Sequence, residues 1–212
     1  MTCSVSASIA DASVACTMAQ AFPVDLRHVG CDCMIRLRSA SAPDDAPYIM
    51  AHRAVLSRAG YFASLFRHTK PDSIYQGTDA GGWTFYAVYT IEAPFGVPVI
   101  QFLIDCLYAS QALGRANAAD PITDAIDVAG ACYFLQMPTP YTDVFVETAI
   151  DTVAKHAPPA PTVVLARLCV LVRCMLDAGV YRDDNRRTLF NRVIAVLSPR
   201  DADLFGRLYF CT

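Results

Sequence analysis

The chain has 212 residues, of which 54% are hydrophobic and only 17% are charged, and its formal net charge is −3 at pH 7. This composition excludes an intrinsically disordered chain, and the small acidic excess provides no basic surface for nucleic acid. Charged residues interrupt the apolar runs before they reach the roughly 18 residues that a membrane-spanning helix needs. The apolar excess therefore predicts a protein–protein interface and no membrane segment.

The cysteines are nine in number, and an odd count argues against a disulfide framework. Most of them fall within apolar periodic segments, where a free thiol packs as a small hydrophobic group. The N-terminus lacks the basic region and the long apolar region of a signal peptide. We therefore expect a reducing compartment, either the cytoplasm or the nucleus.

Alternating apolar and polar residues predict three strands in the first half of the chain. They follow residues 1–23, a stretch of small residues that predicts either a helix or an unstructured arm. Residues 32–38 and 48–52 are expected to pair as a hairpin around a proline-containing loop at 39–47. Residues 83–92 alternate again and carry aromatic side chains that suit a pleated surface.

Helical periodicity dominates the rest of the sequence. Two short helices are expected across residues 54–68, broken near Ala59 and Gly60, and a polar loop is expected at 69–82. Apolar residues then recur at helical spacing. They predict helices through 97–110, 121–137, 144–156, 164–175 and 190–197, followed by a short turn after Ser198.

Residues 157–161, which include three prolines, interrupt the helices and form the clearest boundary in the sequence. They predict an N-terminal arm (1–23), a domain of strands and helices (24–156), an Ala/Pro linker (157–161) and a helical extension (162–212). Strands followed by helices predict an α+β fold. We expect a small mixed sheet capped by helical hairpins, with a short all-helical extension behind it.

Five short motifs occur in the order that is typical of BTB/POZ domains. An aspartate opens the first strand, Ala-His-Arg with a later leucine closes the second, and a Tyr-Phe helix follows. A Tyr-Ala-Ser helix end and a Leu-Gln-Met segment complete the set. The residues are Asp32, Ala51, His52, Arg53, Leu56, Tyr61, Phe62, Phe66, Tyr108, Ala109, Ser110, Leu135, Gln136 and Met137. Residues 24–156 therefore resemble a BTB/POZ domain.

The helices after the linker resemble the start of the BACK (three-box) region that follows many BTB domains. The resemblance implies a homodimer in which Asp32 and Arg53 face each other in a charged pocket at the interface. The alternative is that Arg53 is solvated and that Asp32 only caps a turn. The sequence contains no motif of a Kelch repeat, a MATH domain or a zinc finger.

The resemblance also implies binding to the N-terminal domain of cullin-3. The contact would be made by the end of the helix at 97–110, by residues 110–120 and by a later helix. The predicted cullin-binding residues are Ile100, Ile104, Tyr108, Tyr141 and Asp143.

The helix at 97–110 carries a second apolar stripe besides its first one. Ile100, Ile104 and Tyr108 recur at i, i+4 and i+8, which makes the helix apolar nearly all round. Such a helix must be covered on two sides. Either both sides are covered within one domain, or one of them forms a groove that accepts a partner helix.

Catalytic and metal-binding patterns are missing. His52 has Ser57 five positions on and Asp32 in the same motif set, but no Gly-x-Ser-x-Gly elbow occurs. The resemblance implies that His52 is a packed structural residue. Cys31 and Cys33 share one face of a strand without further ligands at metal-binding spacing. We expect no enzyme activity, no catalytic residue, no cofactor and no metal.

The leading hypothesis is a homodimeric interaction module that binds the cullin-3 N-terminal domain. It would be a minimal ubiquitin-ligase adaptor for an unknown substrate protein, or a competitor of such adaptors, of the kind that large DNA viruses encode. The alternative is a cullin-independent homodimeric BTB scaffold or transcriptional co-regulator. Neither hypothesis requires nucleic acid or a membrane as a partner.

Overall fold

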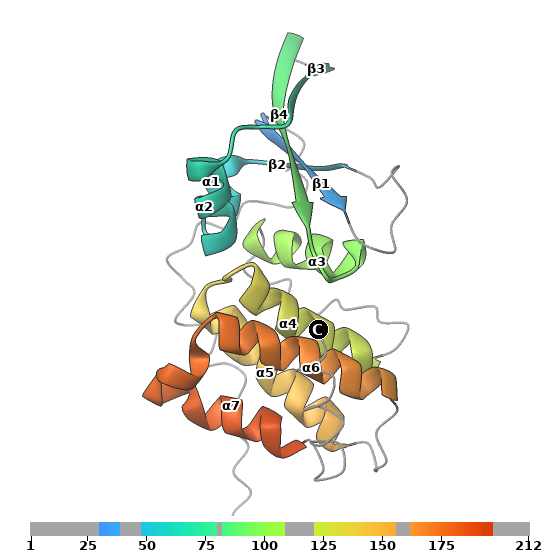
Figure 1. Ribbon diagram of the computed structural model, residues 1–212. Coiled ribbons are helices and arrows are strands. Elements are labelled where there is room, and N and C mark those ends of the chain that lie inside the picture. Colours follow the sequence, from blue (N-terminus) through green and yellow to red (C-terminus); the bar gives the residue numbers. More distant parts are fainter. Residues whose placement is uncertain (1–29, 39–47, 80–81, 109–120, 156–161, 197–212) are drawn as a thin grey trace, which may run out of the picture.

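The computed structural model describes residues 30–38, 48–79, 82–108, 121–155 and 162–196. A sheet lies at one end of the molecule and a layer of helices at the other, and helix α3 (Val97–Tyr108) lies between them (Figure 1). Apart from two short helices between the second and third strands, the strands come first along the chain and the longer helices follow. The predicted α+β class is confirmed.

The sheet contains four strands in the order β2-β1-β4-β3. β1 (Cys33–Arg38) and β2 (Tyr48–Ala51) pair antiparallel, which confirms the predicted hairpin. β4 (Gly82–Glu92), the predicted third strand, pairs in parallel with β1 and places Tyr89 opposite Ile35. The sheet is therefore mixed. Parallel neighbours need a long crossover connection, and here that connection carries β2, two short helices and a further strand.

The additional strand, β3 (Ser73–Asp79), corrects the prediction of a loop at residues 69–82. It pairs antiparallel with β4 at the edge of the sheet and places Tyr75 opposite Tyr86. Consecutive side chains from Ser73 to Gln76 are exposed, so no apolar alternation marks the strand in the sequence. Its pairing with β4 decides its conformation.

The two short helices of the crossover are α1 (Arg53–Leu56) and α2 (Gly60–His68), broken where the sequence predicted. α2 begins against the chain near Gln136, because the amide of Gly60 donates a hydrogen bond to the carbonyl of Gln136 at 2.9 Å. A Cβ at Gly60 would lie 2.5 Å from Oε1 of Gln136. This close approach favours glycine at the start of α2.

The helical layer is built around α4 (Pro121–Phe134). α3 and α5 (Thr139–Ala154) pack against α4, and α6 (Thr162–Asp177) packs along it (Figure 1). Gly130 makes room for the ring of Phe95, because a Cβ there would lie 3.0 Å from that ring, whereas its distance of 3.6 Å from the Cα of Leu171 on α6 would be an ordinary contact.

The last described helix, α7 (Asp184–Val196), follows a short 3-10 helix at Val180–Arg182 and packs against α5 and α6. The predicted helical extension therefore contains α6 and α7. The predicted linker at 157–161, the N-terminal arm and the turn after Ser198 lie outside the described residues.

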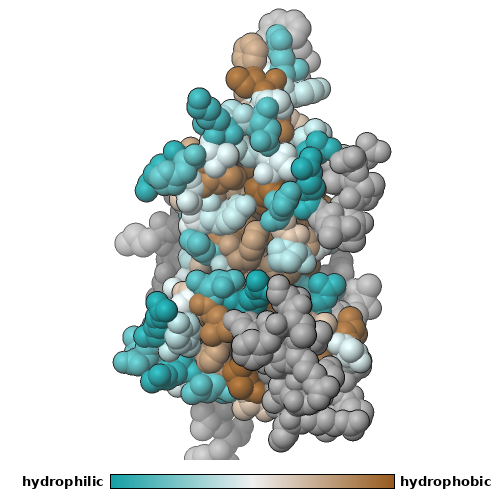
Figure 2. All heavy atoms as spheres, viewed as in Figure 1, coloured by the Kyte–Doolittle hydropathy of each residue, from teal (hydrophilic) through white to brown (hydrophobic). Residues whose placement is uncertain are grey.

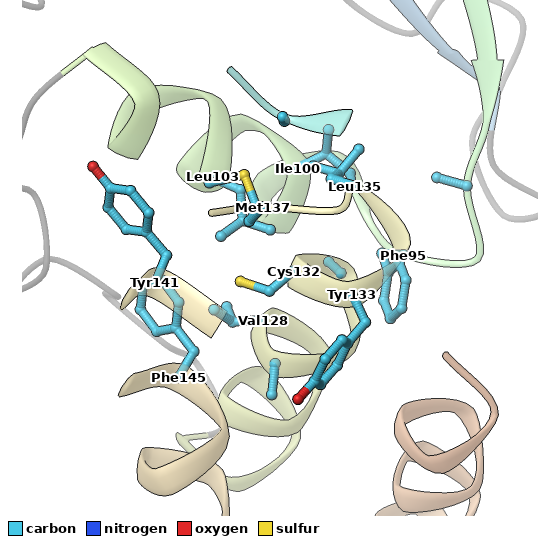
Figure 3. Close-up of a cluster of buried hydrophobic side chains, with 14 of the residues drawn as sticks. Phe95, Ile100, Leu103, Val128, Cys132, Tyr133, Leu135, Met137, Tyr141 and Phe145 are labelled. Carbon is cyan, nitrogen blue, oxygen red and sulfur yellow. The ribbon is translucent and has the colours of Figure 1, made fainter. Parts of the chain in front are cut away.

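One continuous hydrophobic core joins the sheet to the helices on both sides of the predicted linker. Ile35 on β1, Leu103 on α3 and Cys132 on α4 are fully buried, and Val193 on α7 is buried in the same cluster. Figure 3 shows part of this cluster between α3, α4 and α5. The helices after the linker thus dock on the preceding domain.

The cysteines of the described segments are free thiols, and four of them are buried: Cys31, Cys33, Cys106 and Cys132. Burial raises the pKa of Cys33 and of Cys106 to about 12, so both stay protonated at neutral pH. These four thiols pack as small hydrophobic groups, as predicted. Among the described helices, none is both long and apolar enough to cross a membrane.

Candidate interaction site

Asp32 and Arg53 form the best-defined polar pair near the sheet. Asp32 immediately precedes β1, and Arg53 is the first residue of α1. Oδ2 of Asp32 lies 2.8 Å from Nε of Arg53, and its Oδ1 accepts a hydrogen bond from the Arg53 backbone amide at 2.8 Å. The hydrogen bond to Asp32 raises the pKa of Arg53 above its ordinary value. The two side chains thus contact each other within one chain, and Asp32 also binds the first amide of α1.

The same pair remains accessible, because the side chains of Arg53 and Asp32 are 48% and 43% exposed. An ion pair of this exposure contributes about 0–1 kcal/mol to stability. The Arg53 amide at the start of α1 has no partner within the helix, and its hydrogen bond to Oδ1 of Asp32 fixes the orientation of the carboxylate. The pair is therefore a preorganised charged feature on the surface.

His52 is held in place by Tyr108 at the end of α3. The His52 amide donates a hydrogen bond to the Tyr108 hydroxyl at 2.6 Å, and the same hydroxyl lies 3.0 Å from Nδ1 of His52. Because the hydroxyl accepts from the amide, its own proton is free to be donated to Nδ1. These hydrogen bonds link the end of β2 to the end of α3, so His52 has a structural role.

The predicted cullin-binding stripe of α3 is corrected by its burial. Ile100 and Ile104 are fully buried, and Tyr108 is 1% exposed. α3 lies between the sheet and the helical layer, so both of its apolar sides are covered within the chain (Figure 1). In Figure 3, Ile100 lies inside the cluster beside Leu135. The stripe belongs to the core, which was the alternative interpretation.

The two predicted cullin-binding residues on α5 differ in their exposure. Tyr141 is 7% exposed, and its hydroxyl donates a hydrogen bond to the carbonyl of Cys106 at 3.2 Å. It too is a core residue, contrary to its predicted place on a binding face. The side chain of Asp143 is 45% exposed and pairs with Arg186 on α7 at 3.2 Å. Residues 110–120 of the predicted face lie outside the described residues.

An apolar face on the sheet was missed by the sequence analysis. Tyr48 and Tyr75 are 48% and 56% exposed, and the strand register places both side chains on the same face of the sheet. Figure 2 shows hydrophobic residues at the surface near the outer end of the sheet, where β3 and β4 lie in Figure 1. A cavity of about 570 Å³ occupies this face, lined by Met34, Tyr48, Met50, Ser73, Ile74, Tyr75, Gly77, Tyr86 and Val88.

The sequence does contain a signal for this face. Ile74 and Tyr75 are a β-branched and an aromatic residue inside an otherwise polar stretch. Without β3, however, there was no reason to place Tyr75 on the same face as Tyr48. The pairing of β3 with β4 brings both Ile74 and Tyr75 to the sheet, with Tyr75 on the face of Tyr48 and Ile74 on the other. Exposed apolar residues gathered on one face favour association with a partner.

A buried acidic group in the helical layer was also missed. Asp127 on α4 lies 3.4 Å from Arg167 on α6, and the side chain of Asp127 is 10% exposed. Its Oδ1 has no hydrogen-bond partner. Burial raises the pKa of Asp127 to about 6, and the Arg167 charge opposes that rise. The ion pair joins α4 to α6 across the predicted domain boundary.

Within the described segments, no three His, Cys, Asp or Glu side chains are grouped as they would be to hold a metal ion. Searches of family models and of curated proteins gave no match. The fold, the charged pair and the apolar face are therefore the observations from which function is argued.

Proposed function

We propose that the chain is a BTB/POZ-like interaction module that forms homodimers and binds the N-terminal domain of cullin-3. It would present an unknown substrate protein to a ubiquitin ligase, or occupy cullin-3 in competition with such adaptors. The exposed apolar face that contains Tyr48 and Tyr75 is the observation that carries the interaction role. The order of elements, a hairpin, two short helices, a parallel strand and then helices, supports the BTB-like part.

The homodimer is supported by the Asp32–Arg53 pair, which is preformed and half exposed. A fixed charged pair can set the register of an interface while adding little affinity. The apolar sheet face supplies the kind of surface that association buries. In this proposal the dimer interface contains Asp32 and Arg53.

Arg53→Glu is expected to shift the chain from dimer to monomer at micromolar concentration, since it places two like charges together at the interface. Sedimentation equilibrium measures the change. Arg38→Glu is the matched control, because Arg38 is 60% exposed and lies 3.9 Å from its partner Glu92. Both variants should keep the melting temperature. A chain that is monomeric before any substitution contradicts the dimer.

The cullin contact is proposed on the exposed side of α5, because Ile100, Ile104, Tyr108 and Tyr141 are buried. Asp143 and its neighbour Val144 are the accessible residues there, with side chain 45% and residue 41% exposed, respectively. An exposed valine beside a carboxylate provides both an apolar and a polar contact to a helical partner.

Calorimetric titration with the cullin-3 N-terminal domain tests this contact. We expect about one cullin per chain and a Kd below about 1 μM. Asp143→Lys should weaken binding by about tenfold or more. Glu92→Lys, the same charge change on an 80% exposed side chain of β4, should leave it unchanged. Absence of binding at tens of micromolar contradicts the cullin part of the proposal.

A second candidate is a homodimeric scaffold or transcriptional co-regulator that does not bind cullin. The burial of the α3 stripe favours it, because that stripe was the largest apolar surface assigned to cullin. The two experiments separate the candidates. The scaffold is supported if Arg53→Glu dissociates the dimer and if titration with the cullin-3 N-terminal domain gives no heat of binding.

A further inference from the structure

A cavity of about 480 Å³ lies where the ends of α4 and α6 meet the starts of α5 and α7. It is separate from the sheet face and from the Asp32–Arg53 pair. Phe134, Met137 and Ala178 contribute apolar lining, and Tyr133 and Arg186 contribute polar groups. A cavity of this volume, lined by both apolar and polar side chains, is large enough to hold a small molecule.

Two buried donors at this cavity have no partner. The hydroxyl of Tyr133 and Nε of Arg186 are both buried, and neither makes a hydrogen bond. Tyr133 as a whole is only 5% exposed. A buried polar group without a partner lowers stability, so native structures contain few of them and each requires an explanation. A ligand that accepts hydrogen bonds would satisfy both donors.

The charge of the site indicates which acceptor fits. The guanidinium of Arg186 lies over the Tyr133 ring, with Cζ 5.8 Å from the ring centroid, and its Nη2 lies 3.2 Å from Oδ1 of Asp143. Nε of Arg186 therefore still lacks a hydrogen-bond acceptor. Burial raises the pKa of Tyr133 to about 12, so its hydroxyl keeps its proton at neutral pH. Two donors and a cation are the complement of a carboxylate.

Figure 3 shows how α4 directs the two neighbouring side chains. Cys132 points into the hydrophobic cluster, and Tyr133 leaves the helix in a different direction, with its hydroxyl away from Met137. The helix thus separates a core position from a cavity position in consecutive residues. Tyr133 lines the cavity as a residue, while its hydroxyl is closed to solvent.

We propose that this cavity binds a small monocarboxylic acid with an apolar body, whose carboxylate accepts hydrogen bonds from Nε of Arg186 and the hydroxyl of Tyr133. Asp177 also lines the cavity and Asp143 lies beside Arg186, so a ligand with two negative charges is disfavoured. Both donor atoms are closed to solvent in this structure. Binding therefore includes a small turn of the Arg186 guanidinium, whose side chain is 22% exposed.

The probe for this site is phenylacetate, followed by NMR through the Nε–H signal of Arg186 in the isotope-labelled full chain. Phenylacetate should shift this signal saturably and raise the melting temperature, since a ligand that binds only the folded state stabilises it. Phenylacetamide has the same shape without the charge, and it should bind about tenfold more weakly or worse. Shifts that grow linearly without saturation overturn the proposal.

Three variants locate the site, with binding followed through the melting temperature. Arg186→Met keeps the aliphatic stem and should weaken phenylacetate binding by about tenfold or more. Tyr133→Phe removes only an unpartnered hydroxyl, so it should fold normally and bind several-fold more weakly. Arg192→Met is the matched control on α7, because Arg192 pairs with Glu147 at 2.6 Å and does not line the cavity. Equal binding by the Arg186 and Arg192 variants overturns the proposal.

The carboxylate could come from a free acid or from the C-terminus of a peptide. An acetylated dipeptide that ends in phenylalanine with a free carboxylate distinguishes the two. Tighter binding of the dipeptide than of phenylacetate assigns the site to a peptide terminus, and tighter binding of phenylacetate assigns it to a free acid. If neither probe binds, there is no carboxylate site.

Discussion

Replacement of Ile104 by alanine should lower the free energy of unfolding by about 3 kcal/mol, because it leaves a cavity at a fully buried position between the sheet and the helical layer. Urea denaturation measures the loss. If the isoleucine were exposed at the surface as part of a binding site, the same substitution would lower the free energy of unfolding by well under about 1 kcal/mol. The experiment therefore separates a core residue from a binding residue.

The matched control is Ile74→Ala, the same substitution on β3 at an isoleucine that is 67% exposed. We expect a change below about 1 kcal/mol there, which reflects mainly the lower strand preference of alanine. Ile74 points to the face of β3 opposite Tyr75, outside the proposed association face, so neither substitution is expected to act through that face in dimerisation assays. If the two substitutions destabilise the chain equally, the contrast between core and surface assigned to these residues is wrong.

Replacement of Asp127 by asparagine should raise the free energy of unfolding at pH 7 by about 2–3 kcal/mol. The folded chain holds the Asp127 pKa at about 6, above its ordinary value of 3.8, so the folded state favours the protonated form. Asparagine resembles that neutral form. Each pKa unit corresponds to about 1.4 kcal/mol, and about two units give the expected gain.

The pH dependence gives the sharper test of this prediction. Because the folded pKa is raised, the contribution of Asp127 is fully present below about pH 4 and is lost as the pH rises to about 6. The difference between variant and parent should therefore be near zero at low pH and level off above about pH 7. Asp151→Asn, at an exposed carboxylate on α5, should show no such rise. A variant that is less stable than the parent at pH 7 would mean that the ion pair with Arg167 outweighs the burial of Asp127.

The Asp127–Arg167 pair also bears on how the two parts of the chain hold together. It lies between α4 and α6, which come from opposite sides of the predicted linker, and it sits beside a shared apolar core. A buried ion pair is weak evidence for stability, because desolvation opposes the attraction of the two charges. The apolar contacts around Leu171 and Gly130 are therefore expected to provide most of the stability of this junction.

Local sequence alone predicted most of the elements. The hairpin of β1 and β2, strand β4, and the break between α1 and α2 follow from period-two alternation and from the residues around Gly60. The α+β class followed from their order. These features depend on neighbours close along the chain, and a sequence displays such neighbours directly.

Long-range contacts decided what the sequence left open. β3 exists because it pairs with β4, and only that pairing brings Ile74 and Tyr75 to the sheet. The stripe of Ile100 and Ile104 could face a partner or the core, because helical period shows that a side is apolar and not what covers it. Burial between the sheet and α4 resolved the question in favour of the core.

The sequence by itself determined the fold class and the alternation of exposed and buried faces, since these depend on residue type and spacing. Only the tertiary structure decided which apolar faces stay free, that Asp127 is buried beside Arg167, and that Tyr133 and Arg186 meet at a cavity. The reason is physical: burial and charge pairing depend on distances between elements that are remote along the chain.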